Sequence, residues 1–131
     1  MKPATKEWIE KAEGDYRTAL RERRVRKDPN HDAVCFHTQQ CIEKYLKAIL
    51  TEHEITFPKI HDLVKLGEMC LHITPELKSL EAELDLLSRY AIAFRYPGAI
   101  ATKEEAKAAI KAMEKVRKLT RDYLTKLKES R

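Results

Sequence analysis

Apolar residues recur every three or four positions along most of the chain, which is the spacing of one face of an α-helix. Proline breaks a helix interior, and Pro29, Pro58, Pro75 and Pro97 divide this pattern into five segments. The segments predict helices over residues 5–24, 31–53, 61–71, 75–94, and from 102 nearly to the C-terminus. The predicted fold is an all-α antiparallel up-and-down bundle of four long helices and one short one, in a single domain spanning residues 1–131.

The second segment is the predicted central helix, because its apolar positions cover roughly 200° of the helical wheel and so require neighbours on more than one side. Glu43 and Lys47 form an i,i+4 pair that we place on its narrower, solvated face. The fourth segment has an apolar patch opposite its core stripe, formed by Ala82, Leu86, Tyr90 and Ala93. Such a patch favours an interface, and a two-fold homodimer is the commonest arrangement.

Composition narrows the class of protein. With 3 Gly and 5 Pro in 131 residues, the chain has too few turn residues for an all-β fold. No apolar run approaches the length that crosses a bilayer, and the first residues do not resemble a secretory signal. Three cysteines without a C-x-x-C pair favour reduced thiols in a cytoplasmic protein. The net charge of +5 permits binding to a polyanion without establishing it.

Several polar residues depart from the amphipathic pattern. Gln39 falls within the apolar arc of its helix, where a structural hydrogen bond is favoured over a ligand contact. Arg117 lies in the apolar arc of the last helix; we favour an extended side chain that reaches solvent, with Asp15 as the alternative partner. His37 and Cys41 have a spacing that could hold a metal, but Cys35 points away from them, so buried thiols are favoured and no cofactor is expected.

Two positively charged segments are candidates for phosphate binding. Residues 21–27 hold five cations, which either form a solvated helix end or contact phosphate. Arg95 stands at the end of the fourth helix, just before Tyr96 and a Pro-Gly break. A planar guanidinium there could hold phosphate through two hydrogen bonds or cap the last carbonyls of the helix. Arg89, six residues earlier, is a further candidate.

Several motifs together resemble the HEPN family (higher eukaryotes and prokaryotes nucleotide-binding domain), over nearly the whole chain. They are Trp8-x3-Ala12-x2-Asp15-x3-Ala19, Phe36-x2-Gln39-Gln40-x2-Glu43-Lys44-x-Leu46-Lys47-Ala48-x-Leu50, His61-Asp62-Leu63 and Arg95-Tyr96-Pro97. The resemblance implies a helical bundle that dimerises and that is often encoded beside a minimal nucleotidyltransferase. Many such pairs are toxin–antitoxin systems in which the HEPN member is a metal-independent ribonuclease.

The ribonuclease signature that the resemblance implies is Arg, four to six residues, then His. Counting from Arg95, the His positions hold Ile100, Ala101 and Thr102; counting from Arg89, they hold Phe94, Arg95 and Tyr96. In some family members a Tyr two residues after that His is modified by the partner, and Thr102 takes its place here. RNA cleavage through the 2′-hydroxyl needs an acid–base group near neutral pH, and its loss costs about 10²–10⁴-fold in rate.

The sequence therefore predicts a HEPN-like module that dimerises through Leu86, Tyr90 and Ala93. We expect it to bind a nucleotidyltransferase and to hold nucleotide or RNA phosphate through Arg95, Tyr96 and Arg89. The alternative is an active ribonuclease toxin with a divergent site. His61 and His37 lie in other segments, and we expect His61 to cap the third helix or to pack at the corner between the second and third helices. A helical adaptor that binds neither nucleotide nor RNA is the third hypothesis.

Overall fold

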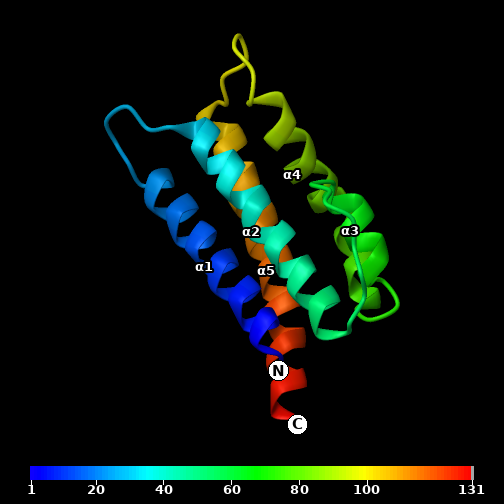
Figure 1. The fold of residues 1–131 in the computed structure, drawn as a ribbon. Helices are drawn as coiled ribbons and strands as arrows, with labels where there is room; N and C mark the ends of the chain where they lie inside the picture. Colours follow the sequence, from blue (N-terminus) through cyan, green and yellow to red (C-terminus); the bar gives the residue numbers. More distant parts are fainter. Residues whose placement is uncertain (131) are drawn as a thin grey trace.

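The computed structural model describes residues 1–130, and the only regular elements there are helices (Figure 1). They are α1 (Pro3–Arg23), α2 (His31–Glu52), α3 (Leu63–Cys70), the 3₁₀ helix η1 (Pro75–Leu80), α4 (Glu81–Ala93) and α5 (Lys103–Glu129). The long helices α1, α2, α4 and α5 alternate in direction along the chain, so the helical bundle predicted from the periodicity is confirmed. The α1–α2 and α4–α5 loops lie at one end of the molecule, and the two termini lie at the other.

Helix α2 is central, as its wide apolar arc predicted, because it contacts α1, α3, α4 and α5. Its side chains Ile42, Tyr45, Leu46 and Ile49 are fully buried. The buried face of α1 carries small residues, among them Ala12 and Ala19, which allow α1 to approach α2 closely. No helix within residues 1–130 is both long and apolar enough to span a membrane.

Helix starts follow local capping chemistry. The Asn30 side chain accepts a hydrogen bond from the Ala33 amide at the start of α2, and Thr102 and Glu105 form the predicted capping box of α5. At α3 the cap is Asp62, which accepts from the amides of Val64 and Lys65. Of the two alternatives for His61, capping of this helix is therefore wrong, and α3 begins two residues later than predicted.

The fourth predicted helix is divided in two. Residues 75–80 form η1, because the Leu77 amide bonds to the Thr74 carbonyl three residues back, at 3.1 Å, in the tighter 3₁₀ pattern. The Thr74 hydroxyl donates to the Cys70 carbonyl at the end of α3 and does not cap the next helix. A continuous α-helix over residues 75–94 was therefore a wrong prediction.

The apolar patch of α4 is less exposed than predicted. Leu86 and Tyr90 are half-buried and pack against the core, whereas Ala82 and Ala93 are exposed. The Tyr90 ring also packs edge-to-face on Phe94, with 5.5 Å between the ring centroids. The large exposed apolar side chain of α4 is Ile92, which the wheel did not single out.

Candidate functional site

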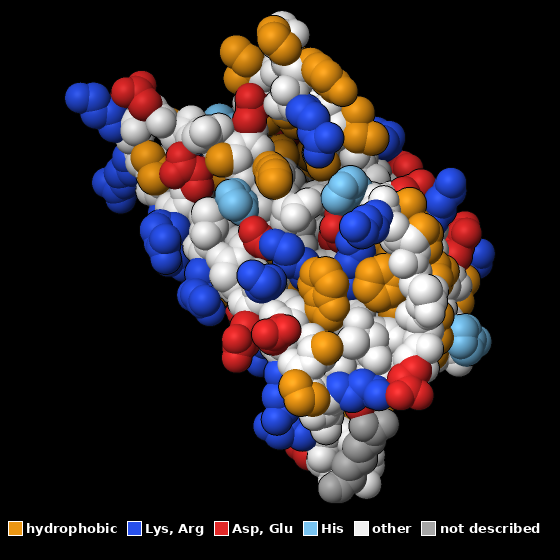
Figure 2. All heavy atoms as spheres, viewed as in Figure 1, with side chains coloured by type: hydrophobic (Ala, Val, Ile, Leu, Met, Phe, Trp, Pro, Cys, Tyr) orange, Lys and Arg blue, Asp and Glu red, His pale blue; other side chains and the backbone are white. Residues whose placement is uncertain are grey.

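Two hollows meet on the face between α2 and α4. The first, of about 460 Å³, lies between the start of α2 and the end of α4; its lining includes Phe36, His37 and Tyr90. The second, of about 390 Å³, lies between the α2–α3 loop and α4; its lining includes Gln39 and His61. Ala91 and Arg95 line both hollows, so we call the combined surface the Arg95 groove. Figure 2 shows basic, histidine and apolar side chains together on this face.

Arg95 stands just beyond the end of α4, and its backbone amide donates to the Ile92 carbonyl at 3.3 Å. Its side chain is exposed and forms no ion pair with any residue in the described part of the chain. The following Gly98 has a φ of +93°, a conformation that glycine adopts without strain and that turns the chain toward α5. Tyr96, next to Arg95, is 65% exposed.

Arg89 differs from Arg95 in its charge balance. Its Nε donates to Asp85 Oδ2 one turn earlier at 2.8 Å, and both side chains are more than half exposed. Arg89 also lines the second hollow, so both predicted cations share this wall of the groove. Because the carboxylate partly satisfies Arg89, Arg95 is the more available phosphate donor of the two.

Gln39 and His61, which line the second hollow, belong to a buried polar cluster centred on Glu43. The Glu43 carboxylate accepts from Gln39 Nε2, Lys47 Nζ and His61 Nδ1, each at 2.9 Å. Gln39 also donates to the His61 carbonyl at 2.9 Å, which joins α2 to the α2–α3 loop. Burial alone would raise the pKa of the Glu43 carboxyl, but the hydrogen bonds from Gln39, Lys47 and His61 outweigh it and hold that pKa below its usual value.

The cluster around Glu43 contradicts the predicted solvated face of α2 and shows where His61 lies. Glu43 and Lys47 are buried, so their assignment to a solvated face was wrong; the α2–α3 loop and α1 cover them. Lys47 Nζ lies 5.6 Å from the Trp8 ring centroid and 5.7 Å from that of Phe57. His61 lies at the corner between α2 and α3, and its side chain remains 68% exposed while Glu43 holds Nδ1.

His37 has a similar arrangement on the other side of Arg95. Its Nδ1 lies 2.8 Å from Asp15 Oδ1 on α1, and Lys44 donates to the second oxygen of the same carboxylate. Each hollow is thus lined by one histidine whose Nδ1 contacts a carboxylate. A search for His shortly after Arg along the chain could not find this arrangement, because three separate segments supply the side chains.

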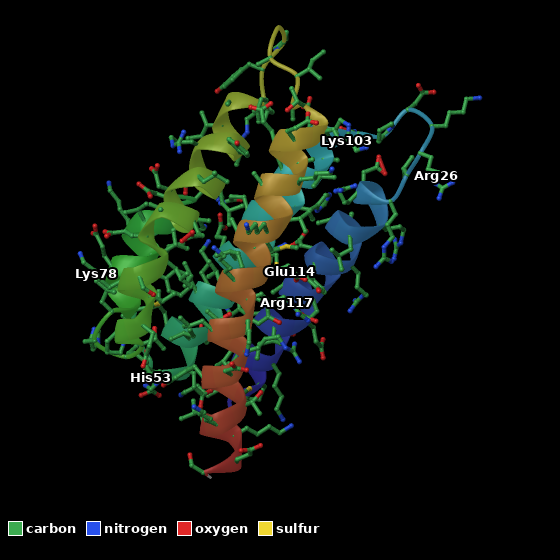
Figure 3. The ribbon with its side chains drawn as sticks, turned by 180° about the vertical axis from the view of Figure 1, so that it is seen from behind. Arg26, His53, Lys78, Lys103, Glu114 and Arg117 are labelled. Carbon is green, nitrogen blue, oxygen red and sulfur yellow. The ribbon has the colours of Figure 1, made fainter. Side chains whose placement is uncertain are left out.

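Arg117 lies elsewhere, between α5 and α1 (Figure 3). Its Nε and second terminal nitrogen donate to the two oxygens of Glu13 at 2.9 and 2.7 Å, and its guanidinium carbon lies 3.6 Å from the Tyr16 ring centroid. Both predictions for Arg117 were therefore wrong: it does not extend to solvent, and its partner is Glu13. His37 and Lys44 already occupy Asp15.

Counted from Arg95, the positions where the ribonuclease signature places His hold no histidine. Ile100 is 80% exposed, and the Thr102 hydroxyl accepts from the Glu105 amide at the start of α5.

Cys35 and Cys41 are buried, and burial raises the pKa of both thiols, to about 12 for Cys35. Within residues 1–130 no group of three or more His, Cys, Asp or Glu side chains is placed to hold a metal ion.

The model of the HEPN domain family matches residues 5–123. The chain belongs to the HEPN domain family. The fold is similar to that of the crystal structure of TT1696 from Thermus thermophilus, with a TM-score of 0.79 and 20% sequence identity. That likeness covers 91% of this chain and 97% of TT1696, and at this identity it supports the fold alone. No curated protein matches the sequence.

Proposed function

We propose that this HEPN domain is a dimeric module that binds the phosphate of a nucleotide or RNA in the Arg95 groove and associates with a minimal nucleotidyltransferase. The observation that carries the proposal is the guanidinium of Arg95, which has no ion-pair partner within residues 1–130 and stands at the junction of the two hollows. A planar guanidinium donates two parallel hydrogen bonds to phosphate, and these fix the orientation of the phosphate while the positive charge attracts it.

Residues in and beside the groove fit the same ligand. Tyr96 follows Arg95 in the chain, and its exposed ring offers a face on which a base can stack; within the groove, the exposed side chain of His61 is a second polar group. Three carboxylates line the groove, but each has another partner: Asp62 caps α3, Asp85 pairs with Arg89, and Asp32 accepts from the Ala101 amide at 2.7 Å. None of the three forms an ion pair with Arg95.

The dimer is supported by exposed apolar side chains near the groove. Ile92, Tyr96 and Ile100 are each more than 60% exposed, and Phe36 is exposed on the first turns of α2. Figure 2 shows apolar side chains gathered at the end of the molecule that carries the α4–α5 loop. Covering such side chains is favourable, and a two-fold contact along α4, including Ala93 and the half-buried Leu86 and Tyr90, would bring two Arg95 grooves together.

Binding at Arg95 is tested by titrating the protein with ATP and with a short RNA in a calorimeter. We expect Arg95→Ala to weaken binding of both at least tenfold, since it removes a charge-assisted phosphate contact. Arg17→Ala is the matched control, because Arg17 is exposed on α1 and lines none of the hollows described above. Equal affinity of the wild type and Arg95→Ala would refute the proposal.

Assembly is tested by light scattering and by co-purification. We expect the wild type to have the mass of a dimer, and Ile92→Glu to shift it to a monomer with unchanged helical content. A nucleotidyltransferase encoded beside the gene should co-purify with the tagged protein. A monomeric wild type at about 100 μM would contradict the dimer, and failure to co-purify would contradict the partner.

A second candidate function, a metal-independent ribonuclease, is favoured by one observation: His61 lines the same hollow as Arg95 and is oriented by a buried carboxylate. In that reaction a base removes the proton of the 2′-hydroxyl, whose oxygen attacks phosphorus while the 5′-oxygen leaves with a proton. His61 would supply the proton transfer and Arg95 would stabilise the phosphorane charge.

The two candidates are separated by incubating an RNA with the protein in EDTA. The binding module predicts intact RNA at high protein concentration. The ribonuclease predicts products with 2′,3′-cyclic phosphate ends, lost in both Arg95→Ala and His61→Ala, and an intact strand when the 2′-hydroxyls are absent. His72→Ala is the matched control, because His72 is exposed and lies outside both hollows.

A further inference from the structure

A second charged hollow, separate from the Arg95 groove, lies where the α1–α2 loop passes the start of α5 (Figure 3). It has a volume of about 620 Å³. Its lining side chains come from the last turn of α1, the loop and the first turns of α2 and α5: Arg23, Arg24, Val25, Arg26, Pro29, His31 and Lys103. We call this surface the basic hollow.

The basic hollow has an excess of positive charge that the protein itself leaves uncompensated. Four of its lining residues are cations and none is a carboxylate. Within residues 1–130 none of the four cations forms an ion pair. Two acidic side chains near these cations in sequence hold backbone amides instead: Glu22 accepts from Asn30 N at 2.8 Å, and Glu105 accepts from Thr102 N at 2.8 Å. Asp28 and Glu104 also neighbour the cations in sequence, but both are exposed and neither lines the hollow.

A favourable interaction with the end of α1 explains only part of this charge. Cations near a helix C-terminus are stabilised by its dipole, which accounts for Arg23 in the last turn of α1. Lys103 gains nothing from that end and stands at the start of α5, where the dipole disfavours a cation. The convergence of Lys103 on the arginines is therefore better explained by an anion that they share.

We propose that the basic hollow binds successive phosphates of a single-stranded nucleic acid, independently of base sequence. The lining holds no Phe, Tyr or Trp, and its one aromatic ring is that of His31, so contacts between the four cations and the phosphate backbone would dominate recognition there. Arginine side chains from adjacent positions can contact neighbouring phosphates, and the hollow is too large for one phosphate group. A free polyphosphate carries the same chemistry, and the test distinguishes it.

The hollow also lies on a path to the Arg95 groove. Pro29 and His31 line the basic hollow, while Asn30, Asp32 and Ala33 line the first hollow of the groove. The first turn of α2 therefore lies between the two surfaces, and one nucleic-acid strand that crosses it could contact both. This continuity rests on the proposed function, whereas phosphate binding in the basic hollow does not.

The test measures anisotropy of a labelled oligouridylate of about 20 nucleotides at 50 to 200 mM salt, with wild-type protein and the R23Q/R24Q/R26Q variant. For single strands the slope of log K against log salt is about −0.7 per phosphate contact. Removing three contacts should reduce the slope by about 2, so that the wild type loses about 20-fold more affinity over this range than the variant. The matched control is K107Q/K111Q/K115Q, which loses the same charge from exposed positions on α5.

Circular dichroism checks that each variant is folded, and Lys103→Gln, which leaves the loop unchanged, should reduce the slope by about 0.7. Equal effects of the two triple variants would overturn the proposal, since only net charge would then matter. Binding of inorganic triphosphate without binding of oligouridylate would assign the hollow to free polyphosphate and overturn the nucleic-acid assignment. An Arg95→Ala variant that loses binding while R23Q/R24Q/R26Q keeps it would support the groove and reject the hollow.

Discussion

The buried cluster around Glu43 gives the most direct test of the structure. The perturbation is Glu43→Gln, which keeps the shape of the side chain and removes its charge. Lys47 Nζ lies 2.9 Å from the carboxylate, and its side chain is only 9% exposed. At an effective dielectric constant near 20, the Coulomb attraction at this distance is about 6 kcal/mol. Dehydrating both charges offsets part of it, and breaking one partner of a buried pair costs about 3–5 kcal/mol.

We expect a cost of about 3 kcal/mol for Glu43→Gln, the low end of that range, because the new amide oxygen still accepts a hydrogen bond. A domain of this size has a free energy of unfolding of about 5–15 kcal/mol, so the variant remains folded. With a urea slope of about 2 kcal/mol per molar, the unfolding midpoint should fall by about 1.5 M. The assay is urea titration followed by far-UV circular dichroism at neutral pH.

Lys47→Met completes the cycle. Because Gln39 and His61 still donate to Glu43, this change should cost less than Glu43→Gln. The double variant should cost clearly less than the sum, since neither charge is then left buried without its partner. Glu68→Gln, at an exposed position on α3, is the control and should change stability by less than about 0.5 kcal/mol. Costs that add within about 0.5 kcal/mol would refute the reasoning.

Four further predictions use the same unfolding assay or a thiol titration. Because the pKa of Glu43 is lowered on folding, its carboxylate contributes to the free energy of unfolding above the usual value of 4.5, and this contribution is lost as pH falls through the folded-state pKa. The stability of the wild type should therefore drop in acid, and that of Glu43→Gln should drop less steeply. All three cysteines are buried with raised pKa values, so a disulfide reagent at about pH 8 should modify none in the native protein and all three in urea; fast native labelling would contradict the burial. Gly14→Ala, where the new Cβ meets open space within α1, should stabilise by about 0.5–1 kcal/mol. Gly67→Ala should destabilise by about 1–3 kcal/mol, because its Cβ would lie 2.7 Å from Leu84 Cδ1; similar effects at the two glycines would contradict the close packing of α3 on α4.

Helix positions were predictable from the sequence because periodicity and caps are local. The capping box at Thr102 and the wide apolar arc of α2 each gave the correct element from a few neighbouring residues. The 3₁₀ helix η1 was missed because the Thr74 hydroxyl bonds to the Cys70 carbonyl, an interaction with the preceding helix that a capping rule does not include.

Errors in polar partners have a different origin. Glu43 and Lys47 satisfy the rule for a solvated i,i+4 pair, yet Trp8 and Phe57 lie close to Lys47 and help to cover the pair. The helical wheel favoured an extended Arg117 side chain and offered Asp15 as the alternative partner, whereas the carboxylate that Arg117 binds is Glu13, two residues before Asp15. A wheel gives direction around one helix, but the pairing depends on the relative shift of two helices along their axes.

The chemistry of the candidate site was likewise not predictable from sequence spacing, because its side chains come from separate segments. The absence of His after Arg95 predicts loss of catalysis only if no other imidazole can reach the same phosphate. Folding brings His61 to the hollow that Arg95 lines and holds its Nδ1 against Glu43. Under the ribonuclease proposal, this contact would orient the ring for proton transfer, as a carboxylate does in catalytic dyads. A motif fixes spacing along the chain, while acid–base catalysis requires only nearness in space and a suitable orientation. Cleavage that depends on His61 would therefore mean that the family's acid–base function has moved to another segment, and intact RNA would mean that the groove keeps phosphate binding alone.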